Sequence, residues 1–153
     1  MNALGVVRRI VEVDEGADLV PVVRDVVERW QRADARGREQ LGRDEVVLSL
    51  LAPDIEIRVH VFDLEDTFRG RDGWIEFWRR WLEIWETYTY EVAELRDLGG
   101  GTTLAQIHVH ARGRGGIPVE GTTFELYRVR DGLLASWEGF PAERAALDAA
   151  QRR

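Results

Sequence analysis

Two histidines separated by one residue, His108 and His110, are the side chains best suited to proton transfer in this 153-residue sequence. They fall in an alternating run that is typical of a strand, so both imidazoles point to one face, about 7 Å apart along the chain. A neutral imidazole beside a carboxylate is a competent general base near neutral pH. The spacing therefore suits acid–base chemistry on a bound molecule.

Three other roles for these histidines stay open. The other face of the same run carries Ala105, Ile107 and Val109, so the histidine face could instead be an exposed or dimer-forming sheet surface. Histidines that face a cavity could also hydrogen-bond a ligand without moving a proton. A metal site would need a further ligand such as His60 or Glu125, and the loose spacing leads us to expect no metal.

Missing residue types narrow the chemistry. The chain has no cysteine and no lysine, which removes thiolate nucleophiles, disulfides, Schiff bases and a P-loop lysine. Its two serines, Ser49 and Ser136, stand outside any G-x-S-x-G context. Catalysis would therefore fall to the histidines, the carboxylates, arginine or the three tyrosines, and we expect no cofactor.

A tryptophan-rich segment, residues 73–88, holds four of the six tryptophans. On an α-helix Trp74, Trp78, Trp81 and Trp85 project within roughly 60° of one another and form one broad apolar face. Charged residues occupy the opposite arc, as expected of a helix with its back in water. The rings either pack a core or also line a cavity for an apolar or aromatic ligand, and periodicity does not separate these roles.

Size and charge bound the class of protein. A chain of this length suits one domain, and we expect residues 1–20 to form an N-terminal arm or strand and residues 21–153 to form that domain. The net charge of −7 argues against a nucleic-acid partner. No apolar run approaches membrane-spanning length and the N-terminal residues lack a signal-peptide core, so we expect no membrane partner and a cytoplasmic location.

The elements that must position these residues follow from periodicity. Two helices are predicted, from Pro21 to about residue 37 and over residues 38–51, and residues 62–73 are predicted to be a loop. The C-terminal residues 142–153 are weakly helical. Predicted strands span residues 4–13 (or an extended arm), 55–61, 88–97, 102–112, 118–129 and 133–140. This order predicts an α+β domain: a curved antiparallel sheet whose concave face is covered by helices, with the tryptophan helix as a lid.

Five short motifs in this order resemble the nuclear transport factor 2-like superfamily and, within it, the SnoaL-like group. The resemblance covers roughly residues 22–147 and implies a cone-shaped pocket. Proteins of this fold include ketosteroid isomerases, epoxide hydrolases, polyketide cyclases and a dehydratase, as well as members that only bind or scaffold, so fold alone does not give the activity. The motifs are Leu51-Ala-Pro-Asp54, Phe68-Arg-Gly-Arg-Asp-Gly-Trp74, Asp97-Leu-Gly99, Ala111-Arg-Gly-Arg-Gly-Gly116 and Tyr127-Arg-Val-Arg-Asp-Gly-Leu133.

The family's known catalytic sets carry over only in part. Aligned on the Asp131–Gly132 turn, the proton-donating aspartate of the ketosteroid isomerases corresponds to Glu125, a usable carboxyl. Their catalytic base corresponds to Val59, and their oxyanion-binding tyrosine corresponds to a position near Val26. Because valine has no acid–base or hydrogen-bonding group, the isomerase mechanism is excluded. The three water-activating residues of the epoxide hydrolases correspond to Gln106, His108 and Gly139, of which only His108 can do acid–base work.

The resemblance also implies where the site lies. It turns the face with His108 and His110 toward the pocket, so that one of them moves a proton while Glu125 or Tyr127 stabilises a developing oxyanion. The partner is then a small apolar or aromatic molecule, and the reaction a cofactor-free isomerisation, cyclisation or dehydration. The alternative is a non-catalytic ligand-binding or dimer-forming accessory module, and a homodimer is expected in either case. The ligand-binding residues on this interpretation are Trp30, Val59, Trp74, Trp78, Trp81, Thr123 and Trp137.

Overall fold

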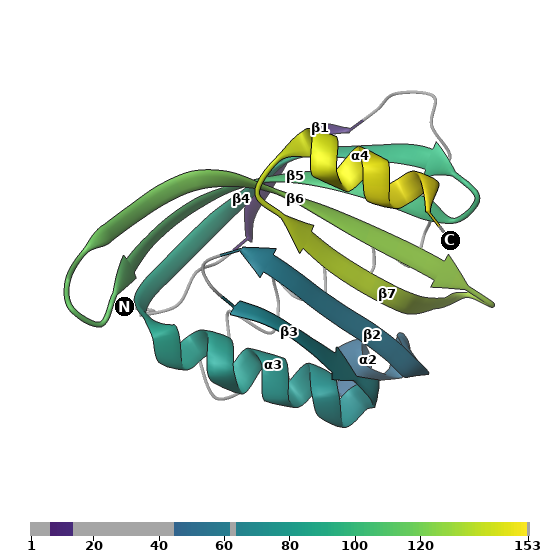
Figure 1. Ribbon diagram of the computed structural model, residues 1–153, viewed down its shortest axis with the longest axis horizontal. Helices are drawn as coiled ribbons and strands as arrows, with labels where there is room; N and C mark the ends of the chain where they lie inside the picture. Colours follow the sequence, from purple (N-terminus) through teal and green to yellow (C-terminus); the bar gives the residue numbers. More distant parts are fainter. Residues whose placement is uncertain (1–6, 14–44, 62–63, 153) are drawn as a thin grey trace.

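A single strongly curved sheet organises the computed structural model, which describes residues 7–13, 45–61 and 64–152 (Figure 1). Seven strands lie in the order β1-β4-β5-β6-β7-β2-β3. Four of the six neighbouring pairs are antiparallel, while β1 with β4 and β2 with β7 are parallel, so the sheet is mixed. The elements are β1 (Val7–Val13), α2 (Glu45–Ser49), β2 (Leu51–Val61), β3 (Leu64–Arg69), α3 (Gly70–Ile84), β4 (Trp85–Gly99), β5 (Thr102–Gly113), β6 (Pro118–Arg130), β7 (Leu133–Phe140) and α4 (Glu143–Gln151).

The meander of long strands after α3 agrees with the predicted α+β fold. Several element boundaries differ from the sequence-based expectation. β2 begins at Leu51, and Pro53 is accommodated where the register with β7 shifts, between Leu51 and Glu56. The expected loop over residues 62–73 contains a strand, β3, which pairs with β2, and the first residues of α3, which begins at Gly70. The tryptophan helix ends at Ile84, because the β-branched and aromatic run that follows favours a strand.

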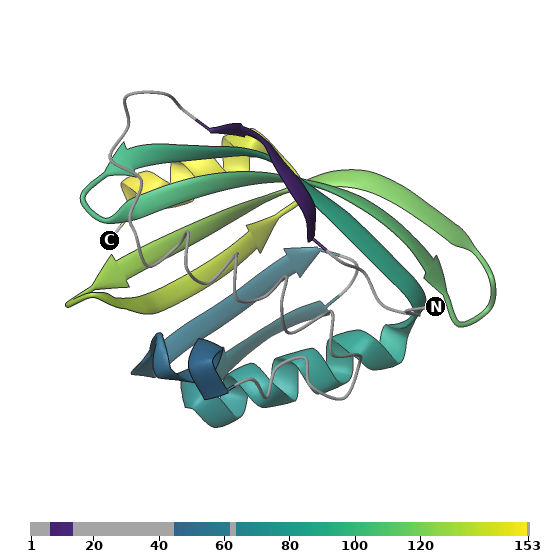
Figure 2. The same ribbon diagram turned by 180° about the vertical axis from the view of Figure 1, so that it is seen from behind.

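The two faces of the sheet carry different helices. The face toward α3, which we call the inner face, holds the larger core cluster, to which α3 contributes four buried aromatic rings. The opposite, outer face is covered in part by α4, whose Ala146 and Ala149 pack on Leu104, Leu126 and Phe140. Figure 1 shows α4 in front of the strands and Figure 2, from behind, shows the strands in front of α4. The helices therefore divide between both faces instead of covering the concave face alone.

Alternation along each strand assigns side chains to these faces. In β2, Ile55, Ile57 and Val59 are buried toward α3, while Arg58 and His60 are exposed on the outer face. This confirms the period-two prediction for the described part of that strand. The same parity decides which of the candidate residues can meet.

The hairpin joining β4 and β5 is fixed to β6 at Gly101. The Gly101 carbonyl accepts a 2.9 Å hydrogen bond from the backbone N–H of Val129, at a point where the register of β6 with β7 shifts. Gly101 has φ +80°, and a Cβ there would lie 2.8 Å from the Val129 carbonyl oxygen. Only glycine fits this close approach without strain.

Several predictions lie outside the described residues. They include the first helix with Trp30 and Val26, and residues 38–44 of the second helix, of which α2 is the described part. Within the ranges given above, no helix is long and apolar enough to cross a membrane.

Candidate functional site

Glu125 places a carboxyl group on the inner face, in the middle of β6. Its partners in register are Ala105 on β5 and Gly139 on β7, two residues with little or no side chain. The indole Nε1 of Trp137 donates a 2.6 Å hydrogen bond to Glu125 Oε1. Glu125 itself is part-buried. The sheet therefore presents one oriented carboxyl among aromatic rings.

This environment changes the acidity of the carboxyl. Burial raises the pKa of Glu125 from 4.5 to about 7, while the hydrogen bond from Trp137 acts in the lowering direction. Burial wins because desolvation penalises the charged form more than one neutral donor stabilises it. A carboxyl that titrates near neutral pH can donate a proton in one step and accept one in another.

Two tyrosines complete the polar part of this face. Burial, with a smaller contribution from the Glu125 carboxylate, raises the pKa of Tyr127 and of Tyr88 well above the ordinary tyrosine value. Tyr88 also has a side-chain hydrogen bond with Trp81, which acts in the opposite direction. Both hydroxyls therefore stay protonated over the physiological range and can serve as hydrogen-bond donors.

The predicted tryptophan wall exists, and it is also a packed core. Trp74, Trp78 and Trp81 are each no more than 6% exposed. Trp78 stacks on Trp137 with ring centroids 5.8 Å apart, and Trp137 in turn stacks on Tyr127 at 6.3 Å. Offset and edge-to-face contacts of this kind add to the free energy of burial. The rings thus form a continuous aromatic layer from α3 to the neighbourhood of Glu125.

The other predicted ligand-binding residues divide into two groups. Val59 and Thr123 lie on the inner face, the first in the same core cluster and the second in register with Ile107. Trp30 lies outside the described residues. The inner face thus brings together Glu125, Tyr127, Trp137, Thr123, Val59 and the three tryptophans of α3.

The two histidines do not belong to this group. His108 is in register with Thr122 and His110 with Glu120, one position out of phase with Glu125, so both imidazoles lie on the outer face. His108 Nδ1 is 3.1 Å from the Thr122 hydroxyl and His110 Nδ1 is 3.2 Å from a Glu120 carboxylate oxygen. The expectation that they face the pocket beside Glu125 is therefore wrong, and the alternative of an outward polar surface describes them.

His60 is equally remote from Glu125. It stacks on Phe140 on the outer face, with ring centroids 5.2 Å apart, and lies 3.8 Å from a Glu138 carboxylate oxygen. In the part of the chain that the structure describes, no three His, Asp or Glu side chains are grouped so that they could hold a metal ion.

The sequence reasoning did not single out Tyr88 and Tyr90, which also face inward. Tyr90 is in register with Val109 and Tyr88 with Ala111, both buried on the inner face. The centroids of these two rings lie 5.7 Å apart, and the centroids of the Tyr88 and Trp81 rings are separated by the same distance. Both tyrosines fall in the predicted strand over residues 88–97, and the alternation Thr87-Tyr88-Thr89-Tyr90 was the available signal that they share a face.

Comparisons with known proteins agree with this architecture. The profile of a family described as "SnoaL-like domain" matches residues 23–137. No curated protein matches the chain in sequence. Among solved structures, the chain is similar to an NTF2-like protein of unknown function from Burkholderia pseudomallei, with TM-score 0.65, 18% identity, and coverage of 86% of this chain and 96% of that one.

Two further crystal structures share the fold. A putative SnoaL-like polyketide cyclase from Jannaschia sp. gives TM-score 0.63 at 14% identity, covering 92% of this chain and 99% of that one. A Mycobacterium tuberculosis protein in complex with estradiol-17beta-hemisuccinate gives TM-score 0.58 at 18% identity, covering 82% and 95%. At these identities the likeness shows the fold alone.

Proposed function

Because the chain belongs to the SnoaL-like domain family, we propose that it binds a small, largely apolar or aromatic molecule against the inner face and exchanges a proton with it through Glu125. The reaction class is cofactor-free acid–base chemistry, such as isomerisation, cyclisation or dehydration. One observation carries the proposal. Glu125 is a part-buried carboxyl, flanked by Ala105 and Gly139, whose pKa is raised to about 7.

The neighbouring side chains have distinct roles in this proposal. Trp137 orients Glu125 through its indole N–H, and it is a positioning residue. Tyr127 and Tyr88, whose hydroxyls stay protonated, stabilise negative charge that develops on a ligand oxygen. Trp74, Trp78 and Trp81, together with Val59 and Thr123, contribute apolar surface, and Trp30 is proposed to add to it. The histidines have no role here because they lie on the other face.

The ligand class has support from the comparisons. The Mycobacterium tuberculosis protein of the same fold was crystallised with a steroid ester. A steroid offers a flat apolar body and a few oxygen atoms, which matches an aromatic surface with one carboxyl and two hydroxyls. A polycyclic molecule with a carbonyl or hydroxyl group is therefore the first class to test.

A non-catalytic binding or accessory module is the second candidate. It is favoured by Val59, an apolar residue at the position aligned with the catalytic base of the ketosteroid isomerases, which is 4% exposed among core side chains. It is also favoured by the stacking of aromatic rings in this layer, Phe77 on Trp81 and Trp78 on Trp137. Binding without turnover would identify this alternative.

Tryptophan fluorescence and thermal shift against steroids, terpenoids, aromatic polyketides and phenols test the proposal. The panel should be run between about pH 5 and pH 9, the range in which Glu125 titrates. Saturable binding that depends on pH in the wild type but not in Glu125→Gln supports the proposal. Binding with the same pH dependence in both proteins contradicts a role for Glu125, and turnover assays on each hit separate the enzyme from the accessory module.

We further propose a homodimer located in the cytoplasm. The outer face carries a polar area in which His110 and Glu120 are exposed and His108 and Thr122 are partly buried, and α4 packs elsewhere on that face. Sedimentation across a concentration series tests the dimer, and monomer at every concentration contradicts it. Fractionation of cells that produce the protein tests its location.

A further inference from the structure

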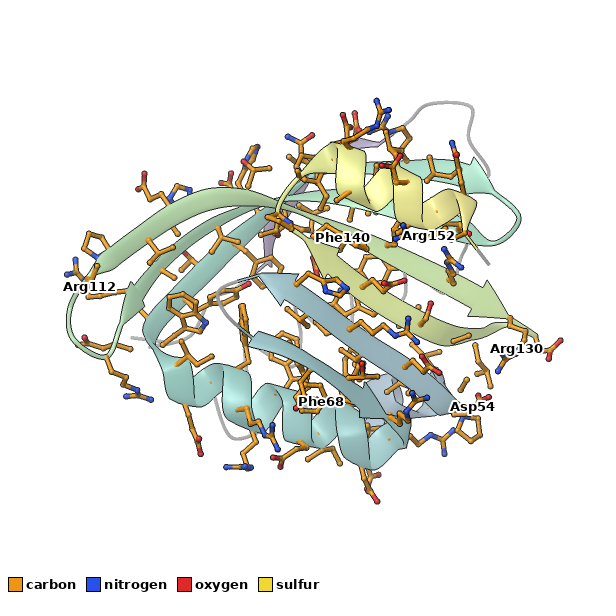
Figure 3. All side chains as sticks on the ribbon, in the orientation of Figure 1. Asp54, Phe68, Arg112, Arg130, Phe140 and Arg152 are labelled. Carbon is orange, nitrogen blue, oxygen red and sulfur yellow. The ribbon has the colours of Figure 1, made fainter. Side chains whose placement is uncertain are left out.

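A groove of about 1030 Å³ lies on the outer face, separated by the sheet from Glu125. Its floor is formed by Arg128 of β6, Ser136 and Glu138 of β7 and the outer face of β2. Leu147 and Ala150 of α4 form an apolar wall. Figure 3 labels Asp54 and Arg130, two charged residues that line one end of the groove.

Most charges in this groove are already paired. Arg130 forms a 2.8 Å ion pair with Asp54. The Glu56 carboxylate forms ion pairs with Arg58 and Arg69, with N–O distances of 2.8 Å and 2.7 Å. These paired side chains are more exposed than Glu138. Because their charges are already compensated within the protein, they contribute little to binding a charged ligand.

Arg128 differs because its guanidinium has no carboxylate partner among the described residues. Its Nη2 donates a 2.7 Å hydrogen bond to the carbonyl oxygen of Ala149, in the last turn of α4. Its Nε is buried without a hydrogen-bond partner. The helix C-terminus supplies only a partial negative charge, so a part-buried full positive charge remains available to an anion.

Glu138 supplies the opposite charge in the same groove. Its side chain is 17% exposed, and its ion-pair partner is His60, at 3.8 Å, which is charged only when protonated. Ser136, in register with Arg128, and Glu138 are two residues apart on β7, so the Cα positions of Arg128 and Glu138 are offset by about 7 Å along the strand direction. No ion pair joins Arg128 to Glu138 within the described part of the chain.

From this arrangement we propose that the groove is a second binding site, for a zwitterionic amino carboxylate. Its carboxylate pairs with Arg128, its ammonium group pairs with Glu138, and the methylenes between them lie over Leu147 and Ala150. Each charge of the ligand pairs with a part-buried group of opposite sign. A molecule with only one charge forms one of these two ion pairs, so the site selects for the zwitterion. An α-amino acid does not fit this spacing, because its two charges are too close together.

Nuclear magnetic resonance of the full chain, titrated with 5-aminovalerate, tests the proposal. The side-chain Nε–Hε signal of Arg128 should shift saturably, together with backbone amides of Leu147 and Ala150. Valerate and pentylamine are the matched probes with one charge each. The expected affinity for 5-aminovalerate is at least about tenfold higher than for either probe.

Two variants at one position provide the matched control. Ser136→Asp places a carboxylate directly across from Arg128 and should abolish the response to 5-aminovalerate, since the guanidinium is then neutralised from within the protein. Ser136→Asn has similar size without the charge and should retain the response. Neither variant removes Arg128 or the Ala149 carbonyl that it bonds, so the comparison does not depend on deleting a residue that contacts the helix.

Glu138→Gln tests the other end of the site. It should remove the preference for 5-aminovalerate over valerate while the Arg128 signal still responds to both. Glu125→Gln should change none of these results, so the outer site can fail or succeed independently of the proposed function.

Several outcomes would overturn the proposal. The first is an equal affinity for 5-aminovalerate and valerate in the wild type. The second is an equal loss of the response to 5-aminovalerate in Ser136→Asp and Ser136→Asn. The third is no shift of the Arg128 signal at millimolar 5-aminovalerate. Shifts at Arg128 that follow protein concentration but not 5-aminovalerate would instead indicate that a second copy of the chain covers the groove.

Discussion

At the scale of single residues, Glu125 is the group whose chemistry depends most on its neighbours. A carboxyl on a strand surface in water would titrate near 4.5, but this one lies between Ala105 and Gly139 beneath an aromatic layer. The hydrogen bond from the Trp137 indole N–H stabilises the carboxylate, but it offsets only part of the cost of burial. The residue is therefore held near the midpoint of its titration at neutral pH, which is useful for proton exchange and costs stability.

The first prediction concerns stability against pH. The folded pKa of about 7 lies above the ordinary 4.5, so the folded state binds the proton more tightly than the unfolded state. The wild type should therefore lose stability as pH rises from 4.5 to 7, by up to roughly 3 kcal/mol, and no more above that range. Glu125→Gln removes this dependence.

Urea denaturation of both proteins across this pH range measures the difference. Glu125→Gln should become the more stable protein as pH rises, because its amide remains neutral and its oxygen can still accept from Trp137. A difference in unfolding free energy that stays constant with pH would contradict the raised pKa.

The second prediction concerns Trp137. Trp137→Phe removes the donor that lowers the pKa of Glu125, so the titration of the carboxyl should move to higher pH. Carbon-13 signals of the glutamate carboxyls report this directly. Trp78→Phe is the matched control, because it removes an indole that stacks on Trp137, while the hydrogen bond that lowers the pKa of Glu125 comes from Trp137 itself. A similar shift in both variants would show that packing, and not the hydrogen bond, is responsible.

The inward position of Glu125 was predictable from the sequence and that of Tyr88 was not, for opposite physical reasons. The Asp131–Gly132 turn, where Asp131 has φ 55° and Gly132 φ 77°, fixes the hairpin register, so alignment on it placed Glu125 correctly on the inner face. Tyr88 follows the junction of α3 and β4, where helical and strand periodicities overlap. Local pattern alone did not place that boundary.

At the scale of elements, strand parity explains the misplaced histidines. The sequence showed that His108 and His110 share a face opposite to Ile107 and Val109, and the structure confirms that relation. The family resemblance turned the histidine face inward, and that part of the prediction is wrong. The apolar set lies against α3 because burial of Ile107 and Val109 is favourable, while imidazoles placed there would need partners.

The third prediction follows from this parity. His108→Gln with His110→Gln should leave the affinity of any inner-face ligand within about twofold of wild type, whereas Glu125→Gln should change its pH dependence. Fluorescence titration with a hit from the ligand panel measures both. A large loss of affinity in the histidine variant would mean that the ligand binds elsewhere.

The fourth prediction concerns the β4–β5 hairpin. Gly101→Ala should destabilise the protein by at least about 2 kcal/mol, since φ is positive and the added Cβ would collide with the Val129 carbonyl. Gly100→Ala is the control, with φ +62° and open space around its Cβ, and should cost only about 1 kcal/mol. Denaturation midpoints compare the two, and equal costs would contradict the close contact.

At the scale of the whole molecule, the sheet separates two chemically different faces. The α3 side holds aromatic rings and Glu125, and the α4 side holds the histidines and the charged groove. The α+β class followed from the order of helices and strands. The parallel pairs, β1 with β4 and β2 with β7, join segments far apart in sequence, and no local pattern specifies such pairing.

The central claim for the molecule is that its inner face holds a carboxyl that exchanges a proton near neutral pH. A carbon-13 pH titration of the glutamate side chains tests it most directly, with Glu125→Gln to assign the signal. We predict that the signal lost in Glu125→Gln titrates in the wild type with a midpoint near 7. If every glutamate signal, including the one lost in that variant, titrates below about pH 5, the claim is contradicted.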